Sequence, residues 1–159
     1  MKAKSRNVLL SLGVIFAVAV TAHANGLVAL SGDLNQTRFV SGTCNGSVCR
    51  SVFEGSGTVN IMGHVTWTAH TVQDFSGFPC NTATAEITLV GATGSITISD
   101  SCGTVCPSAT VNGAPFTIES VWNVIGGTGQ FSDIIGSGTN QSTIGGQGPN
   151  VRLRGIVVF

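Results

Sequence analysis

Few side chains in this sequence could carry acid–base chemistry. The alternation of residues along the predicted strands places only one of them on an apolar face. Asp100 follows Ile96 and Ile98 at alternate positions, so the three share one face of a predicted strand. Asp100 also stands at the end of that strand, where an acid could reach the mouth of a cavity. It is therefore the one weak catalytic candidate. The alternative is a strand-end aspartate that accepts hydrogen bonds from a turn.

The other acids and the histidines do not form a recognisable catalytic or metal-binding pattern. Glu86 alternates with threonines, and Glu119 lies opposite the face of Trp122, so both are expected to face solvent. His64 and His70 share the polar face of one strand, but six residues at ~3.3 Å each separate them by roughly 20 Å. The sequence has no G-x-S-x-G nucleophile motif. We therefore predict no metal and no cofactor.

Two tryptophans are the remaining candidates for a binding site. Trp67 is two residues from Val65, and Trp122 is two residues from Val124. Residues two apart in a strand share a face, so each tryptophan lies on an apolar strand face. In a barrel such faces point to the interior, which is either filled with side chains or holds one small ligand. Trp67 and Trp122 are thus either cavity-lining residues or plain core.

The cysteines indicate an oxidising compartment. All five follow the N-terminal leader described below: Cys44, Cys49, Cys80, Cys102 and Cys106. Their spacings, CNGSVC and CGTVC, are not the C-x-x-C pairs of zinc sites, so disulfides are expected. We expect Cys44 to bond Cys49 across a hairpin, and Cys80 to bond Cys102 or Cys106. A Cys102–Cys106 bond that leaves Cys80 free is the alternative, and either scheme leaves one thiol over, which could link two chains.

The N-terminus has the three parts of a signal peptide. Basic residues at positions 2, 4 and 6 precede an apolar run over 8–20, and Ala22-His23-Ala24 supplies a small–x–small cleavage site. The run is shorter than the ~20 residues that span a bilayer. We therefore expect residues 1–24 to be removed and residues 25–159 to form one secreted or periplasmic domain.

Charge excludes nucleic acid as a partner of residues 25–159. This part contains seven acids, four scattered arginines and no lysine. Binding to nucleic acid needs clustered basic side chains that displace counterions from the phosphates. The expected partner is instead a small apolar ligand, with a monomer or a disulfide-linked dimer as the oligomeric state.

Alternation of apolar and polar residues predicts eight antiparallel strands, near 36–43, 50–60, 63–72, 83–90, 95–100, 115–125, 131–141 and 150–158. Tight glycine-bearing turns at 60–64, 91–94 and 126–130 alternate along the chain with longer connections at 44–49, 73–82, 101–114 and 142–149. In an up-and-down meander, the tight turns then gather at one end and the long connections at the other. Eight such strands most simply close into an all-β barrel, which removes the sheet edges. A β-sandwich is the alternative.

One turn resembles a known family. The glycines at 126, 127 and 129, with Thr128, Phe131 and Gly136, are similar to a turn motif of the allene oxide cyclase and dirigent-protein barrels. The specific match covers about twenty residues, and strand count extends it loosely over residues 25–159. The resemblance implies an eight-stranded barrel with an apolar interior. It also implies that such a cavity can guide a cyclisation or coupling reaction without a cofactor.

Three functions are compatible with these patterns. The first is a non-enzymatic exported barrel that binds a small apolar ligand or presents its disulfide-linked loops to a partner. The second is a cofactor-independent cyclase or isomerase, for which Asp100 is the only acid available. The third is a small outer-membrane barrel, because alternation alone does not say whether the apolar faces point inward or to lipid.

Overall fold

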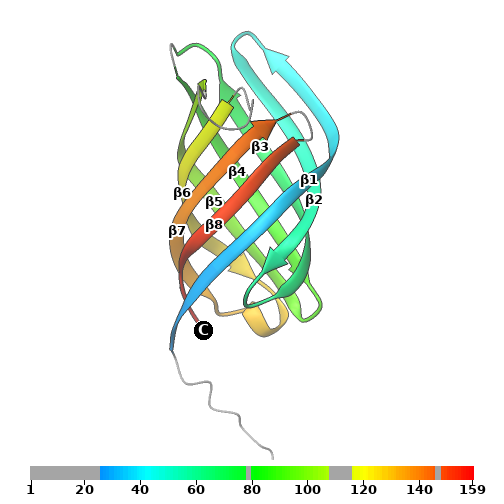
Figure 1. Ribbon diagram of the computed structural model, residues 1–159, viewed down its shortest axis with the longest axis vertical. Coiled ribbons are helices and arrows are strands. Elements are labelled where there is room, and N and C mark those ends of the chain that lie inside the picture. Colours follow the sequence, from blue (N-terminus) through cyan, green and yellow to red (C-terminus); the bar gives the residue numbers. More distant parts are fainter. Residues whose placement is uncertain (1–25, 78–79, 108–115, 146–147) are drawn as a thin grey trace, which may run out of the picture.

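The computed structural model describes residues 26–77, 80–107, 116–145 and 148–159, and in it the chain forms a closed antiparallel barrel (Figure 1). Its strands are β1 (Leu27–Asn45), β2 (Val48–Val59), β3 (Gly63–Asp74), β4 (Asn81–Gly91), β5 (Gly94–Pro107), β6 (Phe116–Gly127), β7 (Ile135–Gly145) and β8 (Gly148–Val158). Each strand pairs with the next, and β8 pairs with β1. The barrel prediction is confirmed in preference to the sandwich. The expected signal peptide lies outside the described residues.

The alternating pattern forms the barrel because every second side chain points inward. On β3, Val65, Trp67 and Ala69 are buried, whereas His64 and His70 are exposed. The same period places Ile87 and Leu89 of β4 in the interior. Burial of these faces is the main force that closes the sheet. The described residues contain no helix long and apolar enough to cross a membrane.

The two ends of the barrel differ as the spacing of the turns predicts. Strands β2 and β3, β4 and β5, and β6 and β7 are joined at the lower end in Figure 1, and the opposite ends of the strands lie at the upper end. One upper connection is shorter than predicted. Cys44 pairs with Cys49 and Asn45 with Val48, which leaves a two-residue turn in which Gly46 adopts a φ of 62°. Glycine takes this left-handed conformation without the strain that a Cβ causes.

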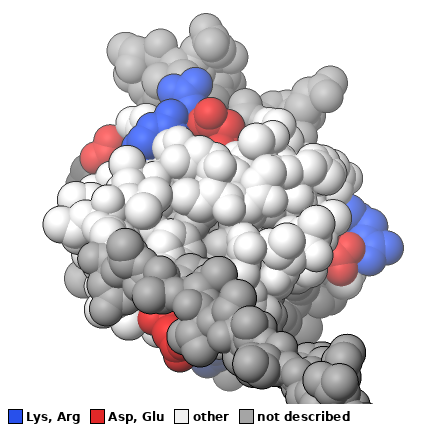
Figure 2. All heavy atoms as spheres, turned by 90° about the horizontal axis from the view of Figure 1, so that it is seen from below, with Lys and Arg blue, Asp and Glu red and all other residues white. Residues whose placement is uncertain are grey.

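The lower end is closed by the segment between β6 and β7. It forms a short 3-10 turn, η1 (Gly129–Phe131), rather than the beginning of a strand at 131. Gly129 has a φ of 63°, and Phe131 turns inward to contact Phe159, with ring centroids 6.0 Å apart. The chain therefore seals the base before β7 begins at Ile135. Figure 2 views this end, where charged side chains lie toward the margin of the visible surface.

Strand β1 is longer than the sequence predicts. It starts at Leu27 instead of 36, because Leu27 to Asn35 pair with β8 from Val158 to Asn150 and thereby close the barrel. Beyond Asn35, β1 continues alongside β2 alone, up to the Asn45–Val48 turn. The β1–β2 hairpin therefore extends past the start of β8, as the blue-to-cyan ribbon in Figure 1 shows.

Candidate functional site

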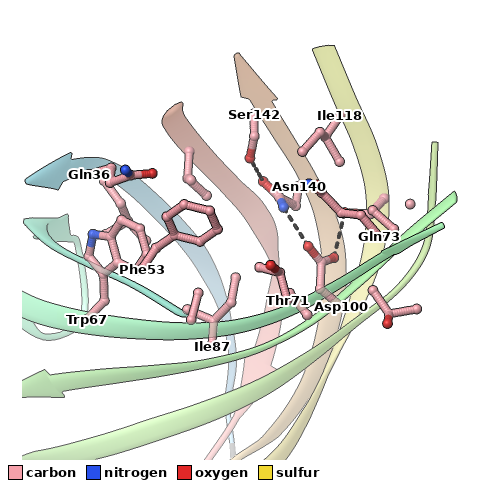
Figure 3. A pocket seen from close by; sticks show the side chains of 18 residues that line it. Gln36, Phe53, Trp67, Thr71, Gln73, Ile87, Asp100, Ile118, Asn140 and Ser142 are labelled. Carbon is pink, nitrogen blue, oxygen red and sulfur yellow. Dashed lines mark hydrogen bonds between the residues drawn. The ribbon is translucent and has the colours of Figure 1, made fainter. Parts of the chain in front are cut away.

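The interior of the barrel is filled in its lower half and hollow in its upper half. A cavity of about 200 Å³ lies in the upper half, and Figure 3 shows the side chains that line it. All eight strands contribute to its wall. The lining residues are Leu34, Gln36, Phe53, Trp67, Ala69, Thr71, Gln73, Ala83, Thr84, Ala85, Ile87, Asp100, Gly103, Ile118, Ser120, Asn140, Ser142 and Val151.

Most of the cavity wall is apolar. Phe53 and Trp67 stand on one side with Ile87 beneath them, and small alanines on β3 and β4 leave space between them (Figure 3). An apolar protein cavity of roughly 150 Å³ is large enough to bind benzene. The volume in this barrel therefore suits a molecule with one ring or a short alkyl chain.

A hydrogen-bonded polar cluster lies on the side opposite Trp67. The Asp100 carboxylate accepts hydrogen bonds of 2.6 Å from Ser120 Oγ and of 2.6 Å from Asn140 Nδ2. Ser142 Oγ donates to Asn140 Oδ1 at 3.0 Å. These contacts tie together β5, β6 and β7, so the carboxylate is held in a fixed position.

Burial sets the electrostatics of this cluster. Asp100 is only 5% exposed. Desolvation raises the pKa of the Asp100 carboxyl above its ordinary value, and the hydrogen bonds from Ser120 and Asn140 offset part of that rise. Among the described residues that line the cavity, none is Arg, Lys or His. Asp100 is therefore a buried carboxyl group without a positively charged partner in the cavity wall.

Two further polar atoms lie in the wall without hydrogen bonds. Gln36 Oε1 and Trp67 Nε1 are buried and have no hydrogen-bond partner among the described residues. Both side chains stand near Phe53 (Figure 3). A buried polar group without a partner costs about 1–3 kcal/mol, so this part of the wall is unusually polar for a plain core.

The two tryptophans singled out from the sequence have different positions. Trp67 lines the cavity, but Trp122 does not. Trp122 is fully buried in the filled half of the barrel, over Gly138 and Gly155, and its Nε1 donates to Thr139 O at 3.0 Å. The absence of side chains at these two glycines makes room for the indole, which is why Trp122 is core.

Asp100 lies in the wall as an inward-facing acid. Its carboxylate bonds to Ser120 and Asn140 on neighbouring strands and not to a turn. Ser120, Asn140 and Ser142 were not among the predicted site residues. Their signal was present, because the inward positions of β7 from 136 to 142 are Gly136, Gly138, Asn140 and Ser142, and none of these four is a large apolar residue, which is unusual for a buried face.

The turn motif around Gly126 serves the closed end and not the cavity. A side chain at Gly127 would meet Phe131 O, and one at Gly136 would meet Val157. Gly129 needs its positive φ to begin η1. Gly126 differs, because nothing lies within 4 Å of the position of an added Cβ.

The cysteines lie at the upper end. The Cys44–Cys49 disulfide is confirmed, with a Cα–Cα distance of 4.0 Å. Cys80 is also disulfide-bonded, so it is not the free thiol of the alternative scheme. The side chains of Cys102 and Cys106 lie outside the described residues, and the choice between them stays a prediction.

The other titratable groups are on the outside. His64, His70, Glu86 and Glu119 are exposed. Within the described residues, no three His, Cys, Asp or Glu side chains come together as a metal site.

Comparisons with known proteins do not indicate a function for this barrel. A scan against protein-family models found no matching model, and searches of curated proteins and of solved structures found no match.

Proposed function

We propose that this protein is an exported barrel that binds one small, mainly apolar molecule in its upper cavity. The observation that carries the proposal is the contrast between the two halves of one interior. Large, fully buried side chains such as Phe131 and Trp122 pack the lower half, whereas alanines and Gly103 leave about 200 Å³ open above. Protein interiors are normally packed without voids of this size, so a maintained hollow indicates a ligand site.

Export is supported by two independent features. Residues 1–24 have the pattern of a signal peptide, and the barrel carries the Cys44–Cys49 disulfide and a disulfide at Cys80. Disulfides persist in oxidising compartments and are rare in the cytosol. A secreted or periplasmic location follows as part of the proposal.

The polar side chains on the outer face of the barrel argue against the outer-membrane alternative. The outward residues of β3 and β4 include His64, His70 and Glu86, and the threonines between them. A lipid-facing strand needs apolar side chains at these positions. Exposed isoleucines lie on β6, β7 and β8, and other exposed apolar side chains, such as Phe39 of β1 and Val90 of β4, are interspersed with polar ones.

A cofactor-independent cyclase or isomerase is the second candidate, and Asp100 is the observation in its favour. A buried carboxyl with a raised pKa inside an apolar cavity is a possible proton donor or acceptor for a bound substrate. The resemblance of the Gly126–Gly136 turn to the allene oxide cyclase and dirigent family agrees with this candidate. The described lining residues contain no second titratable side chain that could assist Asp100.

Native mass spectrometry of residues 25–159, exported to a periplasm and purified without detergent, tests the proposal. We expect a soluble protein that carries a releasable small molecule. Ala85→Phe fills the cavity and should abolish the extra mass, whereas Thr82→Phe adds the same ring to an exposed position of the same strand and should keep it. Bare chain mass, together with no binding of added propylbenzene by NMR, contradicts the proposal. Recovery only in detergent favours the membrane alternative.

A further inference from the structure

The chemical asymmetry of the cavity indicates what kind of molecule it takes. Phe53, Trp67 and Ile87 form an apolar side, and Asp100 stands on the side opposite Trp67 (Figure 3). A ligand that fills this space contacts hydrocarbon along most of its length and a carboxylate at one end.

The carboxylate is oriented but not saturated. Each oxygen of Asp100 accepts one hydrogen bond, Oδ1 from Ser120 and Oδ2 from Asn140. A carboxylate has about four lone-pair sites, so acceptor capacity remains on the cavity side. Ser142 orients Asn140 in turn. Asn140 and Ser120 are therefore positioning residues that aim a partly free anion into the cavity.

The described arginines outside the cavity do not neutralise this anion. Arg38 pairs with Glu54 on the outer surface at 2.7 Å. Arg152 and Arg154 lie beside Asp33, with side chains 68% and 54% exposed. Arg50 is also exposed.

The strands packed against β5 add no titratable group that faces Asp100. Glu86 of β4 and Glu119 of β6 are both exposed, on the outside of the barrel. No other described residue of these two strands is titratable. The electrostatic partner of Asp100 is therefore not supplied by the described protein.

We propose that the cavity binds a small apolar molecule that carries one ammonium group, with the nitrogen donating to Asp100 and the hydrocarbon part packed against Phe53, Trp67 and Ile87. This inference rests on the proposed function and deepens it. A buried anion is costly unless it is paired and hydrogen-bonded, and a cation delivered by the ligand completes the pair. A neutral ligand of the same shape fills the cavity but leaves the carboxylate unpaired.

Three single-ring probes of similar shape test the charge preference by isothermal titration calorimetry with residues 25–159. Phenethylamine is the cation, propylbenzene is its neutral isostere and phenylacetate is the anion. We expect phenethylamine to bind at least about tenfold more tightly than propylbenzene, as charge-assisted hydrogen bonds are worth more than neutral ones. Phenylacetate should bind most weakly.

Variants connect the preference to Asp100. Asp100→Asn should reduce the ratio of phenethylamine to propylbenzene affinity to near one, while propylbenzene still binds. Glu86→Gln removes the same charge from the outside of the barrel and should leave the ratio unchanged. Ser120→Ala keeps the carboxylate but removes one positioning hydrogen bond, so it should lower the ratio without abolishing it.

A pH series on the unmodified protein gives a readout that does not depend on folding of a variant. Phenethylamine stays charged between about pH 4 and 8, as other alkylamines do. Its affinity should fall as the pH is lowered through the pKa of Asp100, whereas propylbenzene affinity should not fall. Equal affinity for all three probes overturns the ammonium proposal and leaves the ligand-binding function in place. Failure of every probe to bind overturns both.

Discussion

Asn140 on β7 donates a hydrogen bond of 2.6 Å to Asp100 on β5, across the intervening strand β6. Ser120 of β6 donates to the other carboxylate oxygen, also at 2.6 Å. Three neighbouring strands thus meet at one buried carboxyl group inside a barrel that is otherwise largely apolar. The stability of the fold and the chemistry of the cavity are therefore coupled at Asp100.

The first prediction concerns stability against pH. The pKa of Asp100 is raised in the folded state, so the unfolded chain loses its proton at a lower pH than the folded chain. Below pH 3.8, the ordinary pKa of an aspartate, the stabilising contribution of protonated Asp100 is fully present. This contribution is lost as the pH rises through the pKa of Asp100 in the folded protein. The free energy of unfolding of the unmodified protein should fall over this window relative to Asp100→Asn.

Urea unfolding at a series of pH values measures this difference. Glu86→Gln controls for the change in net charge and should follow the unmodified protein. A free energy of unfolding of the unmodified protein that rises with pH relative to that of Asp100→Asn would contradict the assigned direction.

The second prediction concerns the opposite behaviour at Asp74. The backbone N–H of Ser76 and the hydroxyl of Ser47 donate to its carboxylate and lower the pKa of Asp74. The stabilising effect of these hydrogen bonds is present above the ordinary value of 3.8 and is lost as the pH falls through the lowered pKa. In an NMR titration, the amide signal of Ser76 should therefore shift with a midpoint below 3.8. Asp74→Asn should abolish this change in the Ser76 amide signal. A midpoint above 3.8 would refute the prediction that the pKa of Asp74 is lowered.

The third prediction concerns the space beneath Trp122. A methyl group at Gly155 would meet the Trp122 ring and Ser137 O, so Gly155→Ala should destabilise the barrel by about 1–3 kcal/mol through overpacking. Gly126→Ala is the matched control, because the space beside Gly126 is open. Urea denaturation compares the two. Similar stability of both variants would show that the Trp122 packing tolerates an added methyl group.

The fourth prediction concerns the partner of Cys80. Asn81 pairs with Val105 and Thr82 with Thr104. This register, continued by one residue, sets Cys80 opposite Cys106, so we predict a Cys80–Cys106 disulfide. Non-reducing peptide mapping should recover that linked pair and alkylate Cys102 alone. A Cys80–Cys102 peptide would show that the register does not continue past Asn81.

The fold was predictable because its signals are local. Alternation, as at Val65, Trp67 and Ala69, and glycine-bearing turns fix strand number, direction and connection order. Strand ends were less predictable. The first nine residues of β1 were missed, since their partner is β8 at the far end of the sequence, and Phe131 was placed on a strand because its role at the base depends on contact with Phe159.

The site was only partly predictable for a related reason. Asp100 was identified because its alternation with Ile98 fixes the direction it faces. Its partners come from β6 and β7, and nothing local to Ser120 or Asn140 indicates that they share one carboxylate. Trp67 and Trp122 have similar local patterns, and what separates them is the pair of glycines that faces Trp122 from β7 and β8.

The sealed base limits the route by which a ligand could enter or leave the barrel. With η1, Phe131 and Phe159 closing one end, the described part of the barrel is a cup and not a tube, so the ligand that we propose would have no exit through the base. Such a chamber cannot pass a molecule from one side to the other or thread a polymer. If the proposed ligand binds there, one molecule must leave before the next can enter, which is compatible with storage, delivery or the rearrangement of a single substrate.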